Sequence, residues 1–288
     1  MKIAAMTMVY RHYWALSRWY AHHAAQLGAE NLFVLSHGPD PEIGRICPGA
    51  RISVVPRDGF DYFDRMRAEL MDRVHADLAR DYDWVLRSDA DELVCFDPEI
   101  WPSLPAALEA QRVPVVTALG FDLVEQPGDA ALGAGTVFSQ RRAVGFSGHY
   151  SKAVAARRAI PFHLHGVRVA RRRLAGFPFH MPRGLYLAHL KYANTETLGR
   201  GNAIRMAVAR GPGVGLPGAG WAEADADADA FYRRFAEKED LSWEEAEAHA
   251  WRTLSIKPKR NERFSVVKTR ALKLPYRTSL PARFSWQG

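Results

Sequence analysis

Four short apolar runs stand out in the first hundred residues of this 288-residue chain. They cover residues 2–9, 32–35, 52–55 and 84–86, and polar or turn-forming residues bound each of them. Short apolar runs between turn residues are typical of strands that a sheet buries on both faces. The pattern therefore predicts four strands.

Two longer stretches between these runs have helical periodicity. Residues 15–27 place Leu16 and Trp19 on one face and are followed by Gly28, a common stop after a helix. Residues 64–80 repeat an apolar side chain at every fourth position. Strands that alternate with helices indicate an α/β fold with a mostly parallel, Rossmann-like sheet flanked by helices. Ligands of such sheets bind beyond the carboxyl ends of the strands.

Three carboxylates, Asp89, Asp91 and Glu92, follow the fourth apolar run almost directly. In extended backbone the side chains of Asp89 and Asp91 point to the same side. Two carboxylates can hold a Mg²⁺ or Mn²⁺ ion that keeps open positions for phosphate oxygens and water. The alternative is an acidic surface turn without a ligand.

The formal net charge of +7 is unevenly distributed along the chain. Residues 1–150 carry a net charge of −6 and residues 151–288 a net charge of +13. A basic half attracts phosphate groups, whether of a sugar nucleotide, a lipid-linked phosphate, an anionic membrane or nucleic acid. Because no RNP, zinc-finger or helix-turn-helix signature is present, we expect no nucleic-acid partner.

Cys47 and Cys95 are too few for a disulfide framework, although a single bridge between them stays open. The chain shows no secretory signal pattern and no run of about 18 uninterrupted apolar residues. These features predict a cytoplasmic protein, with the inner face of the cell membrane as an optional peripheral contact of its basic half.

Several segments carry further motifs. WYAHHAAQLGAENLFVLSHGPD (19–40) and WVLRSDADELVCF (84–96) lie in the first half, and FDLVEQPGD (121–129) and LYLAHLKY (185–192) in the second. Shorter motifs are the Gln140-Arg141-Arg142 triplet and the pairs Ser151-Lys152 and His165-Gly166. Together they resemble glycosyltransferase family 2-like proteins of the GT-A fold over roughly residues 1–195. The DADE segment in its strand context is the most specific part of this resemblance.

Two positions depart from the pattern of that family. Tyr10-Arg11 stands after the first strand, where family members commonly have Asn-Glu, and Ser36 ends the second strand, where they have Asp. Both positions concern the contacts with the nucleobase and the ribose.

The resemblance implies a metal-dependent, inverting transfer of a sugar from a UDP- or GDP-sugar. The implied acceptor is a cell-surface polysaccharide or a glycolipid. A Mn²⁺ or Mg²⁺ cofactor would stabilise the charge that develops on the leaving diphosphate. We expect a GT-A-like domain over residues 1–198, with a nucleotide-sugar half (1–100) and an acceptor half (101–198), and a helical, basic extension over residues 199–288.

Candidate nucleotide contacts are side chains near the expected strand ends and cations suited to a diphosphate: Tyr10, Arg11, Ser36, Asp40, Arg65, Asp89 and Lys191. Candidate metal ligands are carboxylates of the DADE segment and two later histidines: Asp89, Asp91, Glu92, His165 and His189. The resemblance places His189 where GT-A enzymes often supply a late histidine ligand. Each histidine also has a purely structural interpretation.

An inverting transfer needs a base that deprotonates the acceptor hydroxyl. Asp122 and Glu125 follow the apolar run at 113–119, so we expect them at a strand end on the acceptor side. Their spacing favours neither of them as the base.

Two other functions stay open. A sugar-nucleotide nucleotidyltransferase can use a similar sheet and acidic loop, but the chain lacks a Gly-rich loop with Lys or Arg after its first strand. A non-enzymatic module for an anionic polymer or membrane would use the basic residues of 257–283, with a structural acidic loop.

Overall fold

The structure is a computed structural model that describes residues 1–57 and 59–288. Its first sheet has six strands in the order β3-β2-β1-β4-β9-β6. The strands are β1 (Ile3–Val9), β2 (Leu32–His37), β3 (Arg51–Val55), β4 (Trp84–Arg87), β6 (Val115–Thr117) and β9 (Ala153–Ala156). Strands β1 to β4 are parallel, and β9 runs antiparallel to β4 and β6. The four strands predicted from the apolar runs are confirmed.

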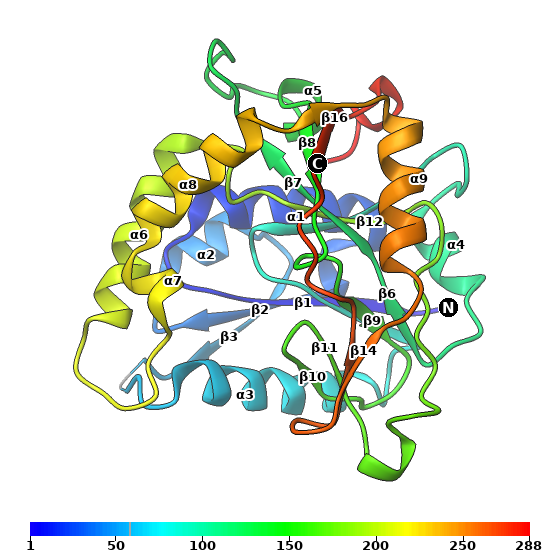
Figure 1. The fold of residues 1–288 in the computed structure, drawn as a ribbon. Coiled ribbons are helices and arrows are strands. Elements are labelled where there is room, and N and C mark those ends of the chain that lie inside the picture. The colour runs from blue at the N-terminus through cyan, green and yellow to red at the C-terminus, as the bar shows by residue number, and fades with distance from the viewer. Residues whose placement is uncertain (58) are drawn as a thin grey trace.

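Helices cover both faces of this sheet (Figure 1). Helix α1 (Tyr13–Leu27) and α2 (Pro41–Ile46) lie on one face, and α3 (Phe63–Leu78) lies on the other. Strand β1 is buried at every position, as expected for a strand with helices on both sides. The α/β class with parallel strands flanked by helices is therefore confirmed.

Helix α1 ends where the sequence predicts its end. Gly28 has a φ of 85°, and its N–H donates to the Ala24 carbonyl at 2.9 Å. Glycine adopts this backbone without the strain that a Cβ would bring. The chain can then turn from α1 into the 3₁₀ turn η1 (Ala29–Asn31) and on into β2.

A second six-stranded sheet has the order β13-β16-β8-β7-β12-β5. Its strands are β5 (Glu92–Phe96), β7 (Leu119–Val124), β8 (Ala143–Phe146), β12 (Leu185–His189), β13 (Glu239–Asp240) and β16 (Tyr276–Ser279). Helix α9 (Trp243–Leu254) packs on it, with the Trp243 ring against Phe121 and Phe146. Residues 199–288 therefore complete this sheet as well as adding helices.

A third, smaller sheet has the order β10-β11-β15-β14. Its strands are β10 (Phe162–His163), β11 (Gly166–Arg168), β14 (Lys259–Asn261) and β15 (Val266–Lys268). It joins the region around residue 165 to the C-terminal part of the chain. The remaining short elements are α4 (Leu104–Glu109), α5 (Val137–Gln140), η2 (Arg171–Arg173) and η3 (Ala282–Phe284).

Helices α6 (Thr195–Ala209), α7 (Ala219–Ala222) and α8 (Ala224–Ala236) lie beyond the carboxyl ends of β1, β2 and β3 (Figure 1). They close the edge of the first sheet at which ligands of α/β proteins bind. Cys47 and Cys95 are both free and buried. None of the helices formed by the described residues combines the length and apolar character needed to span a bilayer.

Candidate functional site

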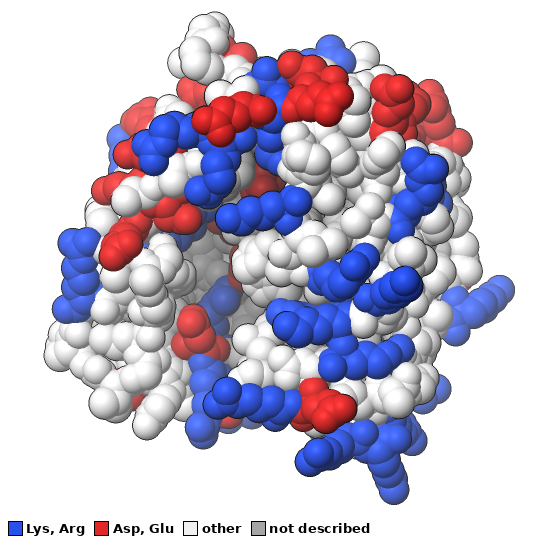
Figure 2. Space-filling view, in the orientation of Figure 1, with Lys and Arg blue, Asp and Glu red and all other residues white. Residues whose placement is uncertain are grey.

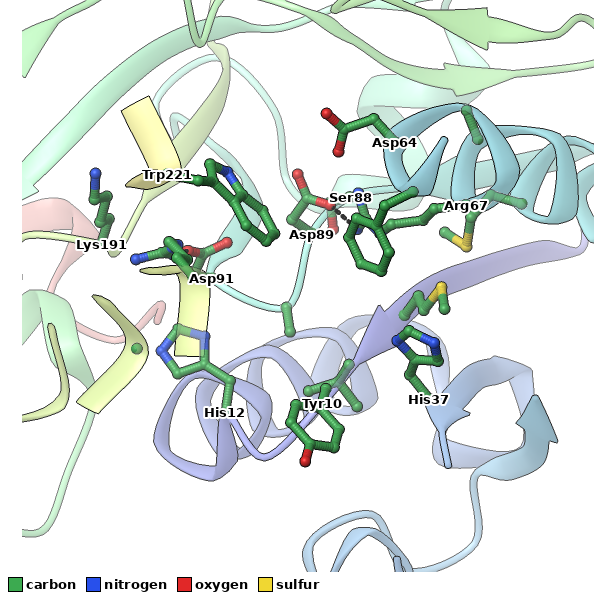
Figure 3. A pocket seen from close by; sticks show the side chains of 18 of the residues that line it. Tyr10, His12, His37, Asp64, Arg67, Ser88, Asp89, Asp91, Lys191 and Trp221 are labelled. Atoms are coloured by element: carbon green, nitrogen blue, oxygen red, sulfur yellow. Dashed lines mark hydrogen bonds and ion pairs between the residues drawn. The ribbon is translucent and has the colours of Figure 1, made fainter. Parts of the chain in front are cut away.

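A pocket of about 970 Å³ lies at the carboxyl ends of β1 and β4. Residues after β1, the first turns of α3, the loop after β4, the β10–β11 hairpin and helix α6 all line it. Figure 3 shows Asp89, Asp91, Trp221, His12 and Tyr10 together around this pocket. The pocket thus occupies the position that the topology predicts for a ligand.

The pocket wall is strongly basic. Among the described residues, three acids line it: Asp64, Asp89 and Asp91. Nine cations of the same part of the chain line it: Arg11, Arg57, Arg65, Arg67, Arg87, Lys152, Lys191, Arg200 and Arg205. The described part of the wall thus has six more cations than acids. A wall of this charge suits a polyanionic ligand such as a diphosphate.

Asp89 is held between two cations. Its Oδ1 pairs with Arg67 of α3, and its Oδ2 lies 3.3 Å from Lys152 Nζ. Burial alone would raise the pKa of the Asp89 carboxyl, but Lys152 and Arg67 outweigh it and hold that pKa well below its usual value. Asp89 is therefore ionised, and both of its oxygens already have partners.

Glu92 is the most deeply buried acid of the DADE segment. Its Oε1 lies 2.7 Å from Lys152 Nζ, and its Oε2 accepts the N–H of Asp89 at 2.9 Å. These contacts fix the turn between β4 and β5. They also occupy both carboxylate oxygens, so Glu92 does not fit the metal-ligand role expected for it. Its contacts instead hold the backbone of the DADE loop in place.

Asp91 faces a histidine that a third residue orients. His189 Nε2 lies 3.8 Å from Asp91 Oδ2, and His189 Nδ1 lies 2.7 Å from Asp122 Oδ1. When Nδ1–H donates to Asp122, the neutral ring turns the lone pair of Nε2 toward Asp91. Two electron-rich groups that face each other beyond hydrogen-bond distance suit a cation between them.

The loop beside His189 depends on a glycine. A Cβ at Gly120 would lie 2.2 Å from the Tyr150 carbonyl carbon. The close approach lets Gly120 N–H donate to Ser151 Oγ at 2.9 Å and brings the Tyr150 ring onto His189, with 3.6 Å between centroids. The same loop carries Lys152 to the DADE segment.

A divalent cation fits the Asp91–His189 pair, with Asp122 behind the histidine. Asp91 Oδ2 also makes a long contact, 3.5 Å, with Arg205. Within residues 1–57 and 59–288 no group of three or more His, Cys, Asp or Glu side chains could hold a metal by itself. Mg²⁺ and Mn²⁺ can be held by one or two protein side chains and take their other ligands from phosphate oxygens and water.

An aromatic cluster forms the end of the pocket next to β2. The Arg57 guanidinium lies 3.4 Å from the Tyr10 ring centroid and 4.7 Å from that of Phe60. His37 stacks on Phe63, and Phe63 contacts Trp221 of α7. Flat, cation-rich aromatic surfaces bind heterocyclic bases by stacking.

Five further candidates reach the pocket. Tyr10, Arg11, Arg65 and Lys191 line it, although Arg65 is largely exposed and pairs with Glu69. Lys191 Nζ lies 3.4 Å from Asp227. His165 also lines the pocket, and burial lowers its pKa to about 3.

Three candidates have other roles. Ser36 is buried and donates to the Gly38 carbonyl, and Asp40 caps α2 by accepting the Glu42 N–H at 3.1 Å. Glu125 accepts the Thr195 N–H at 2.7 Å at the start of α6. None of the three lines the pocket.

The expected position of Asp122 is corrected. It lies inside β7 and not beyond a strand end, because the apolar run at 113–119 splits between β6 and the start of β7. Its side chain is buried beside His189 and does not line the pocket. Asp122 therefore positions His189 and has no contact with the pocket.

Several pocket residues carry no recognisable signal in the sequence. Arg67, Arg57 and Arg205 come from α3, the loop after β3 and α6, where cations usually form an ordinary solvated surface. His12 lies deep in the pocket, and burial lowers its pKa. Lys152 also lines the pocket and differs from these residues, because the Ser151-Lys152 pair is one of the motifs that carry the family resemblance.

Several solved structures have a distant similarity to this chain. No family model and no curated protein sequence matches the chain. Mannose-1-phosphate geranyltransferase from Thermus thermophilus is similar over 97% of this chain and 74% of its own, at 15% identity and a TM-score of 0.33.

Two other solved structures are similar at the same low level. CMP:2-keto-3-deoxy-manno-octonic acid synthetase in complex with CTP matches 80% of this chain and 84% of its own, at 15% identity and a TM-score of 0.27. S. aureus TarS matches 79% of this chain and 43% of its own, at 10% identity and a TM-score of 0.35. Similarities of this size assign no function.

Proposed function

We propose that the chain is a glycosyltransferase that moves a sugar from a nucleotide-sugar donor with the help of Mn²⁺ or Mg²⁺. One arrangement carries the proposal: the Asp91–His189 pair, oriented by Asp122, in a pocket with nine cations. A UDP- or GDP-sugar offers the matching chemistry, which is a diphosphate with a flat base at one end and a sugar at the other.

The cations of the wall would act on the leaving group. Negative charge develops on the nucleoside diphosphate as the glycosidic bond breaks, and fixed cations stabilise that charge without reorganising. Lys191 and Arg205 line the pocket near Asp91, while Arg67 and Lys152 lie on the Asp89 side. A divalent ion held by Asp91 and His189 would supply further Lewis-acid stabilisation of the diphosphate.

Acceptor deprotonation is assigned to Asp64 in this scheme. Asp64 is the only acid of the pocket wall without an ion pair in the described part of the chain, and Figure 3 shows its carboxylate directed at the cavity. Burial raises its pKa, which moves a carboxylate toward the proton affinity that a general base needs. The resemblance to family 2-like enzymes adds inversion of the anomeric centre and a polysaccharide or glycolipid acceptor to the proposal.

Isothermal titration with UDP, GDP and CMP, with Mn²⁺ and then with a chelator, tests the proposal. We expect one nucleotide to bind in the presence of Mn²⁺. Its affinity should fall at least about tenfold with the chelator, which removes the cation, and also in Asp91→Asn, which removes one ligand of the cation. Asp77→Asn, an exposed acid of α3, is the matched control and should bind like the wild type. Metal-independent binding, or full binding by folded Asp91→Asn, would contradict the proposal.

A sugar-nucleotide nucleotidyltransferase is the second candidate, and the number of cations in the pocket favours it, because a triphosphate carries more charge than a diphosphate. The two reactions release different products. Pyrophosphate release from CTP or UTP with a sugar or a sugar phosphate would identify the nucleotidyltransferase, whereas hydrolysis or transfer of the sugar from a UDP- or GDP-sugar would identify the glycosyltransferase.

A further inference from the structure

A second concentration of positive charge lies outside the pocket. Residues 157–176 and 256–273, which build and flank the small β10-β11-β15-β14 sheet, contain thirteen Lys or Arg and a single acid, Glu262. No ion pair within the described residues involves any of the thirteen, although ion pairs are frequent elsewhere in the protein. Figure 2 shows several Lys and Arg side chains together over β10, β11 and β14.

Two of these cations are direct neighbours across the sheet. Lys259 of β14 is the register partner of Lys268 of β15, and Arg168 pairs with Val266 on the adjoining strands. Like charges directly opposite each other destabilise a sheet. Burial, and the neighbouring Lys259 ammonium after it, lower the pKa of Lys268. This arrangement gains stability when an anionic partner covers it.

Exposed apolar side chains flank the same cations. Phe264, in the β14–β15 turn, is 41% exposed, and Ile256, just before β14, is 53% exposed. The Arg263 guanidinium lies 5.2 Å from the Phe264 ring centroid. Leu164, in the β10–β11 turn, is 42% exposed. A soluble polyanion needs only the cations, whereas a bilayer surface offers anionic headgroups together with an apolar layer beneath them.

We propose that this basic face, formed by Arg168, Lys257, Lys259, Arg263 and Lys268 with Ile256 and Phe264 at its edge, docks on an anionic lipid bilayer. The inference goes beyond the proposed function and does not depend on it. The same small sheet reaches the pocket, since residues 162–166 line the pocket wall. If the chain transfers sugars, a lipid-borne acceptor would reach the pocket from this side.

Vesicle sedimentation without nucleotide tests the docking. We expect binding to phosphatidylcholine vesicles that contain phosphatidylglycerol, no binding to pure phosphatidylcholine, and release by high salt because exposed charges are screened. Replacing Lys257, Lys259 and Arg263 by Gln should weaken partitioning about fivefold for each charge removed. The matched control replaces the exposed Arg45, Arg80 and Arg112 by Gln and should bind within about twofold of the wild type, because these residues lie outside the basic face.

A second variant separates a bilayer from a soluble polyanion. Phe264→Ser should weaken binding to the anionic vesicles and leave binding to heparin unchanged, because only the bilayer takes up an apolar side chain. Three results would overturn the inference: equal binding to neutral vesicles, equal losses in the two triple variants, or heparin binding as tight as vesicle binding with no effect of Phe264→Ser. Nucleotide titration of the same proteins reports on the pocket separately.

Discussion

His189 and Asp122 are direct register partners on the parallel strands β12 and β7, and the His189 Nδ1 atom lies 2.7 Å from Asp122 Oδ1. Both side chains are buried, so the contact fixes the histidine ring with its second nitrogen toward Asp91. In metal sites such carboxylate partners orient the histidine and make it a better ligand. A buried carboxylate of the second sheet thus orients a histidine that faces Asp91 in the wall of the pocket.

Asp122→Ala should weaken Mn²⁺-dependent nucleotide binding about 10- to 100-fold, because His189 loses the group that orients it. Turnover at saturating donor and metal should fall much less, because Asp122 does not line the pocket. Asp122→Asn, which can still accept the Nδ1–H, should restore most of the affinity. Lost turnover with unchanged binding in both variants would instead make Asp122 the base.

Lys152→Met should destabilise the protein strongly. Lys152 is the partner of two acids, Asp89 at 3.3 Å and the fully buried Glu92 at 2.7 Å, so its loss leaves buried negative charge uncompensated. Removing one partner of a buried ion pair typically costs about 3–5 kcal/mol.

Urea unfolding at pH 7 measures this cost. Arg65→Met is the matched control, since it removes a cation from an exposed pair with Glu69 and should cost less than about 1 kcal/mol. Equal midpoints for the two variants would show that the Lys152 network contributes no more than a surface ion pair.

The free energy of unfolding should fall as the pH is lowered from 7 to 5. Burial lowers the pKa of His22 and of His75 to about 4 in each case, below the ordinary value of 6.5. Between these values the unfolded chain binds protons that the folded chain does not. Stability therefore rises with pH across this window, by up to about 1.4 kcal/mol per pH unit for each histidine.

Urea unfolding at pH 7, 6 and 5 gives this slope for the wild type and for His75→Leu. The variant should show a slope smaller by up to about one proton, because the unfolded chain then has one fewer imidazole to protonate. His22 should still contribute to the pH dependence of the free energy of unfolding in this variant. Its two nitrogens face the Val94 carbonyl and the Gly288 N–H, an arrangement that only the neutral ring satisfies. Identical slopes in the two proteins would exclude His75 as a contributor.

The four parallel strands of the first sheet were predictable because their signals are local. Apolar runs of strand length, helical periodicity and Gly28 each lie within a few residues of the element that they define. The DADE segment was predictable for the same reason, since its acids follow β4 directly.

The arginine partners Arg67 and Arg205 were not predictable, and the pairing of Lys152 with Asp89 was not either, because these cations come from distant parts of the chain. Arg67, Lys152 and Arg205 meet Asp89 and Asp91 only after α3, the loop before β9 and α6 have packed around the pocket. An arginine on a helix surface carries the same local pattern whether it faces solvent or a buried acid. The second sheet was hidden for a related reason, because β16 pairs with β8 although more than a hundred residues separate them in the chain.

Tyr10→Ala should weaken nucleotide binding about 5- to 150-fold, the loss expected when one aromatic stacking surface of about 1–3 kcal/mol is removed. Tyr10 departs from the residue common in family 2-like proteins, and its ring, with the Arg57 guanidinium stacked on it, lies at the end of the pocket next to β2. Inorganic pyrophosphate with Mn²⁺ is the control ligand, because it has the phosphates and no base. The variant should bind pyrophosphate like the wild type, since the cations on the wall are intact. A parallel loss of nucleotide and pyrophosphate would place Tyr10 at the phosphates, and unchanged nucleotide binding would place the base elsewhere in the pocket.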